Sequence, residues 1–148
     1  MKKFLFILLL IFFSGCSIKQ ALKHDPFYEK TLKYTQRTQI LNSLETKALI
    51  DAVYLNGLYK NKFQNPTFLI GVYNDFDNQL INQEFSICLN GQKPVKISSK
   101  IPKFILYKTF PFYNSWMNYY LVKFPDTGKP YILEYKSKDW GEVKLFFK

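Results

Sequence analysis

The sequence predicts an α+β domain that is mainly β, with an N-terminal helix followed by a small antiparallel β-sandwich. Three observations predict this class. From Thr67 onward, short segments rich in Phe, Tyr, Ile and Val recur along the chain. Glycine- and proline-containing turn signals separate these segments, and one helix-start signal precedes them all.

The helix is expected over 26–38. Asp25 is a residue type that caps helix N-termini, and Pro26 fits the first helical position because its missing N–H needs no partner there. Phe27, Thr31 and Tyr34 follow at helical spacing. A charged and polar remainder suits a surface helix with one face on the core.

Residues 39–62 carry two patterns at once. Leu41, Leu44 and Ala48 continue into a helical stripe, whereas Leu44, Ala48 and Ile50 also belong to an alternation with the period of a strand. The strand is the favoured interpretation, and the helix remains open.

The rest of the chain reads as strands because its aromatic and β-branched residues fit half-buried pleated surfaces. Asn90-Gly91 is a hairpin signal, and turns are expected over 125–130 and 138–141. In the predicted strands, Phe85, Ile87 and Leu89 share one face, as do Tyr120, Val122 and Phe124, and Val143, Leu145 and Phe147. The predicted strands are Thr67–Tyr73, Glu84–Leu89, Val95–Ser99, Phe104–Tyr107, Tyr119–Phe124, Tyr131–Tyr135 and Glu142–Phe147.

The first sixteen residues form a leader pattern. Lys2 and Lys3 precede an apolar run over 4–13, and Ser14-Gly15-Cys16 follows. The apolar run is shorter than the roughly 20 residues that a transmembrane helix needs, so a secretory signal is expected instead. The segment resembles the lipobox of bacterial lipoproteins, with Phe13 where Leu is usual.

This resemblance implies cleavage before Cys16 and a diacylglycerol on its sulfur, usually with a third chain on its new amine. The expected organisation is then a signal peptide over 1–15, a lipidated tether over 16–24 and a single domain over 25–148. By analogy with enteric bacteria, Ser17 after the cysteine would permit export to the outer membrane, so the outer membrane is expected rather than the inner one, with the domain facing the periplasm. The stretch 46–56 also resembles a pattern in uncharacterised bacterial lipoproteins, where a strand precedes a short helix beginning near Asn56.

The charge is strongly basic. Removal of Lys2 and Lys3 with the leader lowers the net charge from +10 to +8. Export from the cytoplasm argues against a nucleic-acid partner. The presence of a single arginine, Arg37, does so too, because arginine is the residue that most often forms paired hydrogen bonds with bases and phosphates. No acidic residue occurs between Glu84 and Asp126, a stretch that contains Lys93, Lys96, Lys100, Lys103, Lys108 and Lys123. One interpretation is that these lysines form a cationic face that binds anionic lipid or polysaccharide. The other, which is favoured, is that they are solubilising side chains on exposed and edge strands.

Catalytic and metal-binding chemistry has few candidates. The one histidine, His24, falls in the tether, and Cys88 has no second thiol once Cys16 carries lipid, so it is expected to be a packed small residue. Asp75 and Asp77 are spaced like the start of a calcium loop, but the glycine and distal glutamate of that loop are missing. We therefore expect no enzyme, no cofactor and no metal.

The segment 110–120 is the richest in aromatic residues, with six among its eleven positions. It either packs over the end of the core, which is favoured, or presents a contact surface through Phe112, Tyr113 and Trp116, flanked by Lys108 and Lys123. The predicted function is therefore that of a lipid-anchored envelope protein, acting as a binding or accessory subunit. An envelope protein partner is expected, and the oligomeric state is left open.

Overall fold

The computed structural model describes residues 25–60 and 62–148. Its eight strands form two antiparallel sheets, of order β1-β2-β3-β6-β5 and β4-β7-β8. The strands are β1 (Thr35–Asn42), β2 (Glu45–Tyr54), β3 (Thr67–Asn74), β4 (Phe85–Leu89), β5 (Lys96–Ser98), β6 (Asn118–Lys123), β7 (Tyr131–Ser137) and β8 (Glu142–Phe147). The helices are α3 (Pro26–Lys33), α4 (Leu55–Leu58) and α5 (Lys103–Thr109). The prediction of a mainly antiparallel β domain is confirmed.

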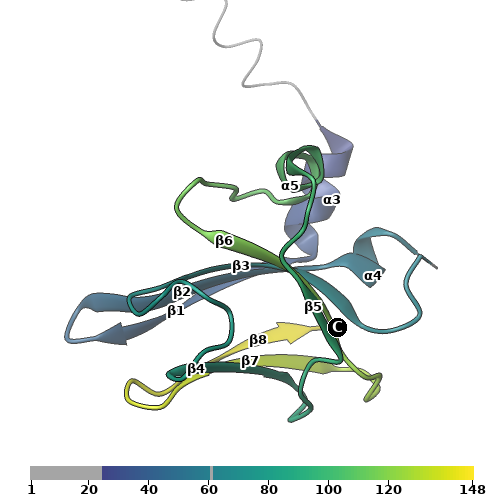
Figure 1. Ribbon diagram of the computed structural model, residues 1–148. Helices are drawn as coiled ribbons and strands as arrows, with labels where there is room; N and C mark the ends of the chain where they lie inside the picture. The colour runs from purple at the N-terminus through teal and green to yellow at the C-terminus, as the bar shows by residue number, and fades with distance from the viewer. Residues whose placement is uncertain (1–24, 61) are drawn as a thin grey trace, which may run out of the picture.

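The five-stranded sheet lies in the middle of the molecule. Figure 1 shows α3 and α5 side by side over one of its faces and the three-stranded sheet against the other. We call the face toward the three-stranded sheet the inner face and the face toward the helices the outer face. Both faces of this sheet therefore carry apolar side chains.

The central strand β3 shows this two-sided burial directly. Phe68, Ile70 and Val72 point to the inner face and belong to one core cluster, whereas Leu69 belongs to a second cluster on the outer face. A strand that is buried on both sides has a nearly continuous run of apolar residues instead of an alternation of apolar and polar ones. The sequence of 67–74 has this pattern.

The inner core joins the two sheets through aromatic contacts. The Phe68 ring lies 5.1 Å from the Phe147 ring and 5.9 Å from the Phe124 ring, both edge-on, and Phe85 stacks on Tyr135 at 5.4 Å. Offset and edge-to-face pairs of this kind each add about 0.5–1.5 kcal/mol to the hydrophobic gain. The predicted inward positions in 84–89, 119–124 and 142–147 all lie in or against this cluster, so those assignments are confirmed.

At one side of the molecule, β1 of the large sheet meets β8 of the small one through a side-chain amide. The Gln36 amide donates to the Phe146 carbonyl and accepts from the Phe146 N–H at 2.9 Å. The amide thus forms the two hydrogen bonds that a neighbouring strand residue would form. This clasp ties the two sheets together at that seam.

The N-terminal region begins as predicted and then departs from the prediction. The Asp25 carboxylate accepts from the N–H groups of Phe27 and Tyr28, so α3 starts at Pro26. The helix predicted over 26–38 is too long, because it ends at Lys33 and β1 begins at Thr35. Thr35, Thr38 and Ile40 are β-branched, and pairing with β2 outweighs the weak helical spacing.

The ambiguous stretch 39–62 is a β-hairpin followed by a short helix, which confirms the strand interpretation and the helix near Asn56. The turn between β1 and β2 places Ser43 at φ 48° and Leu44 at φ 73°. Leucine in the left-handed region is uncommon, and hairpin turns usually use Asn or Gly there. No Asn-Gly or Asp-Gly pair therefore marks this hairpin turn in the sequence.

The strand predicted over Phe104–Tyr107 is wrong, because these residues form helix α5. Leu106, Thr109 and Phe110 are the buried residues, and this spacing of three and four is helical. Pro102 precedes the helix with φ −58° and removes a backbone donor that a strand would need. The alternation of Phe104 and Leu106 was a poor guide, because Phe104 is 71% exposed.

The turn signals have mixed outcomes. Asn90 and Gly91 both have positive φ, as a hairpin turn requires, but β4 and the next strand β5 belong to different sheets. Asn90 instead joins the turn to β7, since its side chain accepts from the Ile132 N–H at 2.7 Å. The turn expected over 138–141 does close the hairpin of β7 and β8, with Gly141 at φ 90°.

Gly71 in β3 makes room for the layer over the outer face. A Cβ at this position would lie 2.8 Å from the Tyr119 ring and 2.9 Å from the Phe110 ring. We predict that Gly71→Ala lowers the free energy of unfolding by about 1–3 kcal/mol, the usual cost of overpacking. Urea unfolding measures this change, with Ser86→Ala at an exposed position of β4 as the control. Equal stability of the two variants would contradict the packing described.

Candidate functional site

An ion pair between a buried carboxylate and a partly exposed arginine underlies the aromatic segment 110–120. On the outer face, Arg37, Asp51, Gly71 and Tyr119 are successive partners across β1, β2, β3 and β6. The Asp51 side chain is fully buried, and it accepts from Arg37 Nε at 2.5 Å and Nη2 at 2.6 Å. This bidentate hydrogen bonding raises the pKa of Arg37 above its usual value.

The aromatic residues cover this pair. The Arg37 guanidinium lies 4.4 Å from the centre of the Phe112 ring, Phe110 meets Tyr119 edge-on at 5.0 Å, and Tyr113 stacks on Tyr119 at 5.2 Å. Burial raises the pKa of Tyr119. Phe112 and Tyr113, predicted to bind a partner, are thus half-buried and packed inward.

Trp116 lies apart from those two residues. Its side chain is 53% exposed and meets Tyr73 edge-on at 5.5 Å, and its carbonyl accepts from Asn78 at 3.0 Å. The 75–78 turn beside it carries Phe76, which is also exposed. Trp116 and Phe76 therefore offer an exposed aromatic surface next to Asp75 and Asp77.

Among the lysines of the acid-free stretch, Lys100 and Lys108 line one groove. Lys123 borders a neighbouring polar hollow with Asn65 and Thr67. The structure therefore does not bring Lys108, Lys123 and Trp116 into a single surface.

The groove that contains Lys108 is the best-formed candidate binding site. It has a volume of about 380 Å³ and lies between α5, the segment 55–63 and the outer face of β3 and β6. Leu55, Leu69 and Leu121 are among its apolar lining residues, with Tyr59 and Ile105 beside them. The volume falls within the range typical of small-molecule sites, which are mostly apolar with a few polar groups.

Three exposed lysines complete this groove. Lys62, Lys100 and Lys108 line it, and its described lining contains no aspartate or glutamate. The Lys62 ammonium lies 5.2 Å from the Tyr59 ring centre, and the Lys108 ammonium lies 5.3 Å from the Phe27 ring centre. These cation–π contacts hold two of the charges beside the apolar floor.

Sequence reasoning selected Lys108 but missed the rest of the groove. Its walls come from four separate segments, which only the fold brings together. One signal was present: just after Ile101-Pro102, Lys103, Phe104, Tyr107 and Lys108 recur at spacings of three and four. That spacing indicates an amphipathic helix with basic and aromatic residues.

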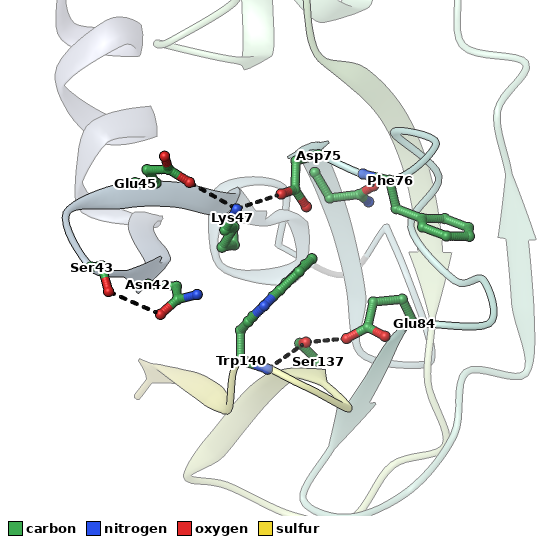
Figure 2. Close-up of polar contacts among 10 residues, drawn as sticks. Asn42, Ser43, Glu45, Lys47, Asp75, Phe76, Glu84, Ser137 and Trp140 are labelled. Atoms are coloured by element: carbon green, nitrogen blue, oxygen red, sulfur yellow. Dashed lines mark hydrogen bonds and ion pairs between the residues drawn. The ribbon is translucent and has the colours of Figure 1, made fainter.

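The carboxylates of Asp75, Asp77 and Glu84 make local structural contacts. Figure 2 shows the Lys47 ammonium between Glu45 and Asp75, at 3.0 and 3.2 Å. Its hydrogen bond to Glu45, and then that to Asp75, raises the pKa of Lys47. Glu84 accepts from the Ser137 hydroxyl and the Asp139 N–H, and the bond from Ser137 lowers its pKa.

Asp77 likewise accepts from the Gln79 N–H at 2.9 Å and from the Asn82 amide. Asn74 organises the preceding turn, since its Oδ1 accepts from the N–H groups of Asp77 and Asn78. Within 25–60 and 62–148, no three His, Cys, Asp or Glu side chains are grouped as metal ligands would be.

Cys88 is half-buried, with its thiol 3.5 Å from Glu134. Burial, followed by the hydrogen bond to Glu134, raises the pKa of the thiol, so it stays protonated and weakly nucleophilic at neutral pH. Cys16 and His24 lie outside the described residues. In the part of the chain that the structure describes, no helix is long and apolar enough to cross a bilayer.

Comparison of the chain with protein-family models, with curated proteins and with solved structures found no match.

Removal of Arg37 tests the buried ion pair. We predict that Arg37→Ala lowers the free energy of unfolding by about 2–3 kcal/mol, because it leaves the Asp51 carboxylate unpaired, while the 43% exposure of Arg37 lets water soften the loss. In that background Asp51→Asn should restore stability, whereas alone it should reduce it.

Chemical denaturation measures all three variants. Lys144→Ala, which removes an exposed ion-pair partner on β8, is the control and should leave stability nearly unchanged, because exposed ion pairs contribute little. A loss for Arg37→Ala no larger than that of the control would show that the pair is not structurally important.

Proposed function

We propose that this chain is a lipid-anchored protein of the cell envelope that acts by non-covalent binding, as a binding or accessory subunit and not as an enzyme. The leader and Cys16 support the anchor. The groove beneath α5 supports the binding role and is the observation that carries it: an apolar floor bordered by three lysines, with no carboxylate among its described lining residues.

The groove lies at the end of the molecule nearest the proposed anchor. Nine residues, 16–24, separate the lipidated cysteine from the described domain, and fully extended they reach about 30 Å at most. Helix α3 follows this tether directly and packs beside α5. This arrangement favours a domain held at the periplasmic surface of a membrane. The analogy at Ser17 favours the outer membrane as that membrane.

We assign the domain to the antiparallel β-sandwiches, serving here as a rigid support for the groove. The shared inner core of the two sheets supports this assignment. Because the outer face of the same large sheet forms the groove floor, the floor positions of Leu69 and Leu121 are set by strands rather than by loops.

The anchor is tested at Cys16. We predict that Cys16→Ala abolishes acyl labelling of the full-length protein in cells fed a clickable palmitate analogue and blocks processing of the leader. Cys88→Ala is the matched control and should label normally. Persistent labelling of Cys16→Ala would reject the anchor.

A second candidate function is a contact with an envelope protein through two exposed residues, Phe76 in the 75–78 turn and Trp116, whose carbonyl accepts a hydrogen bond from Asn78 of that turn. We predict that a photo-crosslinking residue at position 116 gives a discrete adduct with one protein in intact cells. The same residue at position 146, an exposed aromatic position on β8, should give none. Only monomer, or the same adducts at both positions, would reject this surface.

A further inference from the structure

We infer that the groove beneath α5 binds an anionic phospholipid of the anchoring membrane, with one acyl chain in the groove and the phosphate at the lysines. This inference rests on the proposed function and names the ligand of the same site. The shape and lining of the groove, its charges and its location each support it.

The floor of the groove suits a hydrocarbon chain. Leu55 and Leu69 are buried beneath it, and Leu121 and Ile105 line its sides. An alkyl chain placed against such surface gains about 25 cal/mol for each Å² of apolar area removed from water. A sugar or a charged peptide would instead lose hydrogen bonds to water against these side chains without replacing them.

The charges suit a phosphate. Lys62 comes from one segment and Lys100 and Lys108 from another, all three line one opening, and the described lining offers no carboxylate to neutralise them. Ammonium groups bind phosphate as point charges, so they tolerate the varied approach of a lipid headgroup. An uncharged lipid, including the chains of the protein's own anchor, would fill the floor but leave the lysines unmatched.

The surface around the groove suits a bilayer. Phe104 is 71% exposed and Tyr107 61% exposed on α5, next to Lys103 and Lys108, and Tyr28 is exposed on the adjoining helix α3. Exposed aromatic residues combined with lysines are typical of segments that lie at the headgroup level of a membrane. A phospholipid still seated in the bilayer therefore reaches the groove with little exposure of its chain to water.

The inference is tested with the full-length lipidated protein in phosphatidylcholine vesicles. These contain a trace of phosphatidylglycerol with a photoreactive diazirine at the end of one acyl chain, and the labelled peptides are mapped by mass spectrometry. We expect labelling of the floor residues Leu55, Leu69 and Leu121. It should exceed labelling by a phosphatidylcholine probe with the same chain by about fivefold or more, the effect of at least one lysine near an anionic headgroup.

Charge variants identify the headgroup contact. A lysine near an anionic headgroup contributes about fivefold in affinity, so Lys62→Gln, Lys100→Gln and Lys108→Gln together should remove most of the preference for phosphatidylglycerol. The matched control replaces Lys93, Lys96 and Lys138, three exposed lysines outside the groove, and should retain the preference. Circular dichroism verifies that both triple variants are folded.

Three outcomes would overturn the inference. These are equal labelling by the two headgroups, equal loss in both triple variants, and labelling confined to Phe104 and Tyr107 with none on the floor, which would indicate surface contact only. Each leaves the proposed anchor and a protein-binding role standing, since those depend on Cys16 and Trp116. Conversely, floor labelling alongside a negative result at Cys16 would reject the anchor alone.

Discussion

The rest of the structure depends on the burial of both faces of the five-stranded sheet. Covering the inner face requires the three-stranded sheet, and covering the outer face requires α3, α4, α5 and the aromatic segment 110–120. A fully buried carboxylate, Asp51, lies within that outer layer, so Arg37 must reach it from the edge strand. The aromatic rings pack over the Asp51 side of the pair, and Gly71 leaves the Tyr119 and Phe110 rings the space to do so.

Much of the β structure was predictable because its signals are local. The alternation in 84–89 and 142–147 and the Gly141 turn need no knowledge of the remaining chain. The failures have a common physical cause, since tertiary contacts overrode weak local patterns. At 34–38 pairing with β2 cut short a helix, and at 103–109 packing on the outer face turned an apparent strand into a helix.

The candidate site was less predictable than the fold. Lys108 was identified from its charge and neighbours, but Tyr59, Leu69 and Leu121 join it only through sheet order and the position of α5. The aromatic segment was expected to pack over the end of the core, but most of it packs on the outer face of the large sheet, and composition alone did not separate the inward Phe112 and Tyr113 from the exposed Trp116. Such distinctions depend on which side of the sheet each residue reaches.

The Gln36 clasp has a consequence for encounters between copies of the chain. It occupies backbone groups of β8 that another molecule would otherwise use to add a strand. On the free edge of β4, Asn82 forms hydrogen bonds with the backbone of Phe85, and Gln92 does so with the backbone of Leu89. Among the described residues of β4, this leaves only the backbone groups of Ile87 between them open to another strand. Strand β5 is three residues long and carries Lys96. Copies of the chain thus find few unpaired backbone groups on β4, on β5 and at Phe146 of β8, which limits polymerisation through these edges.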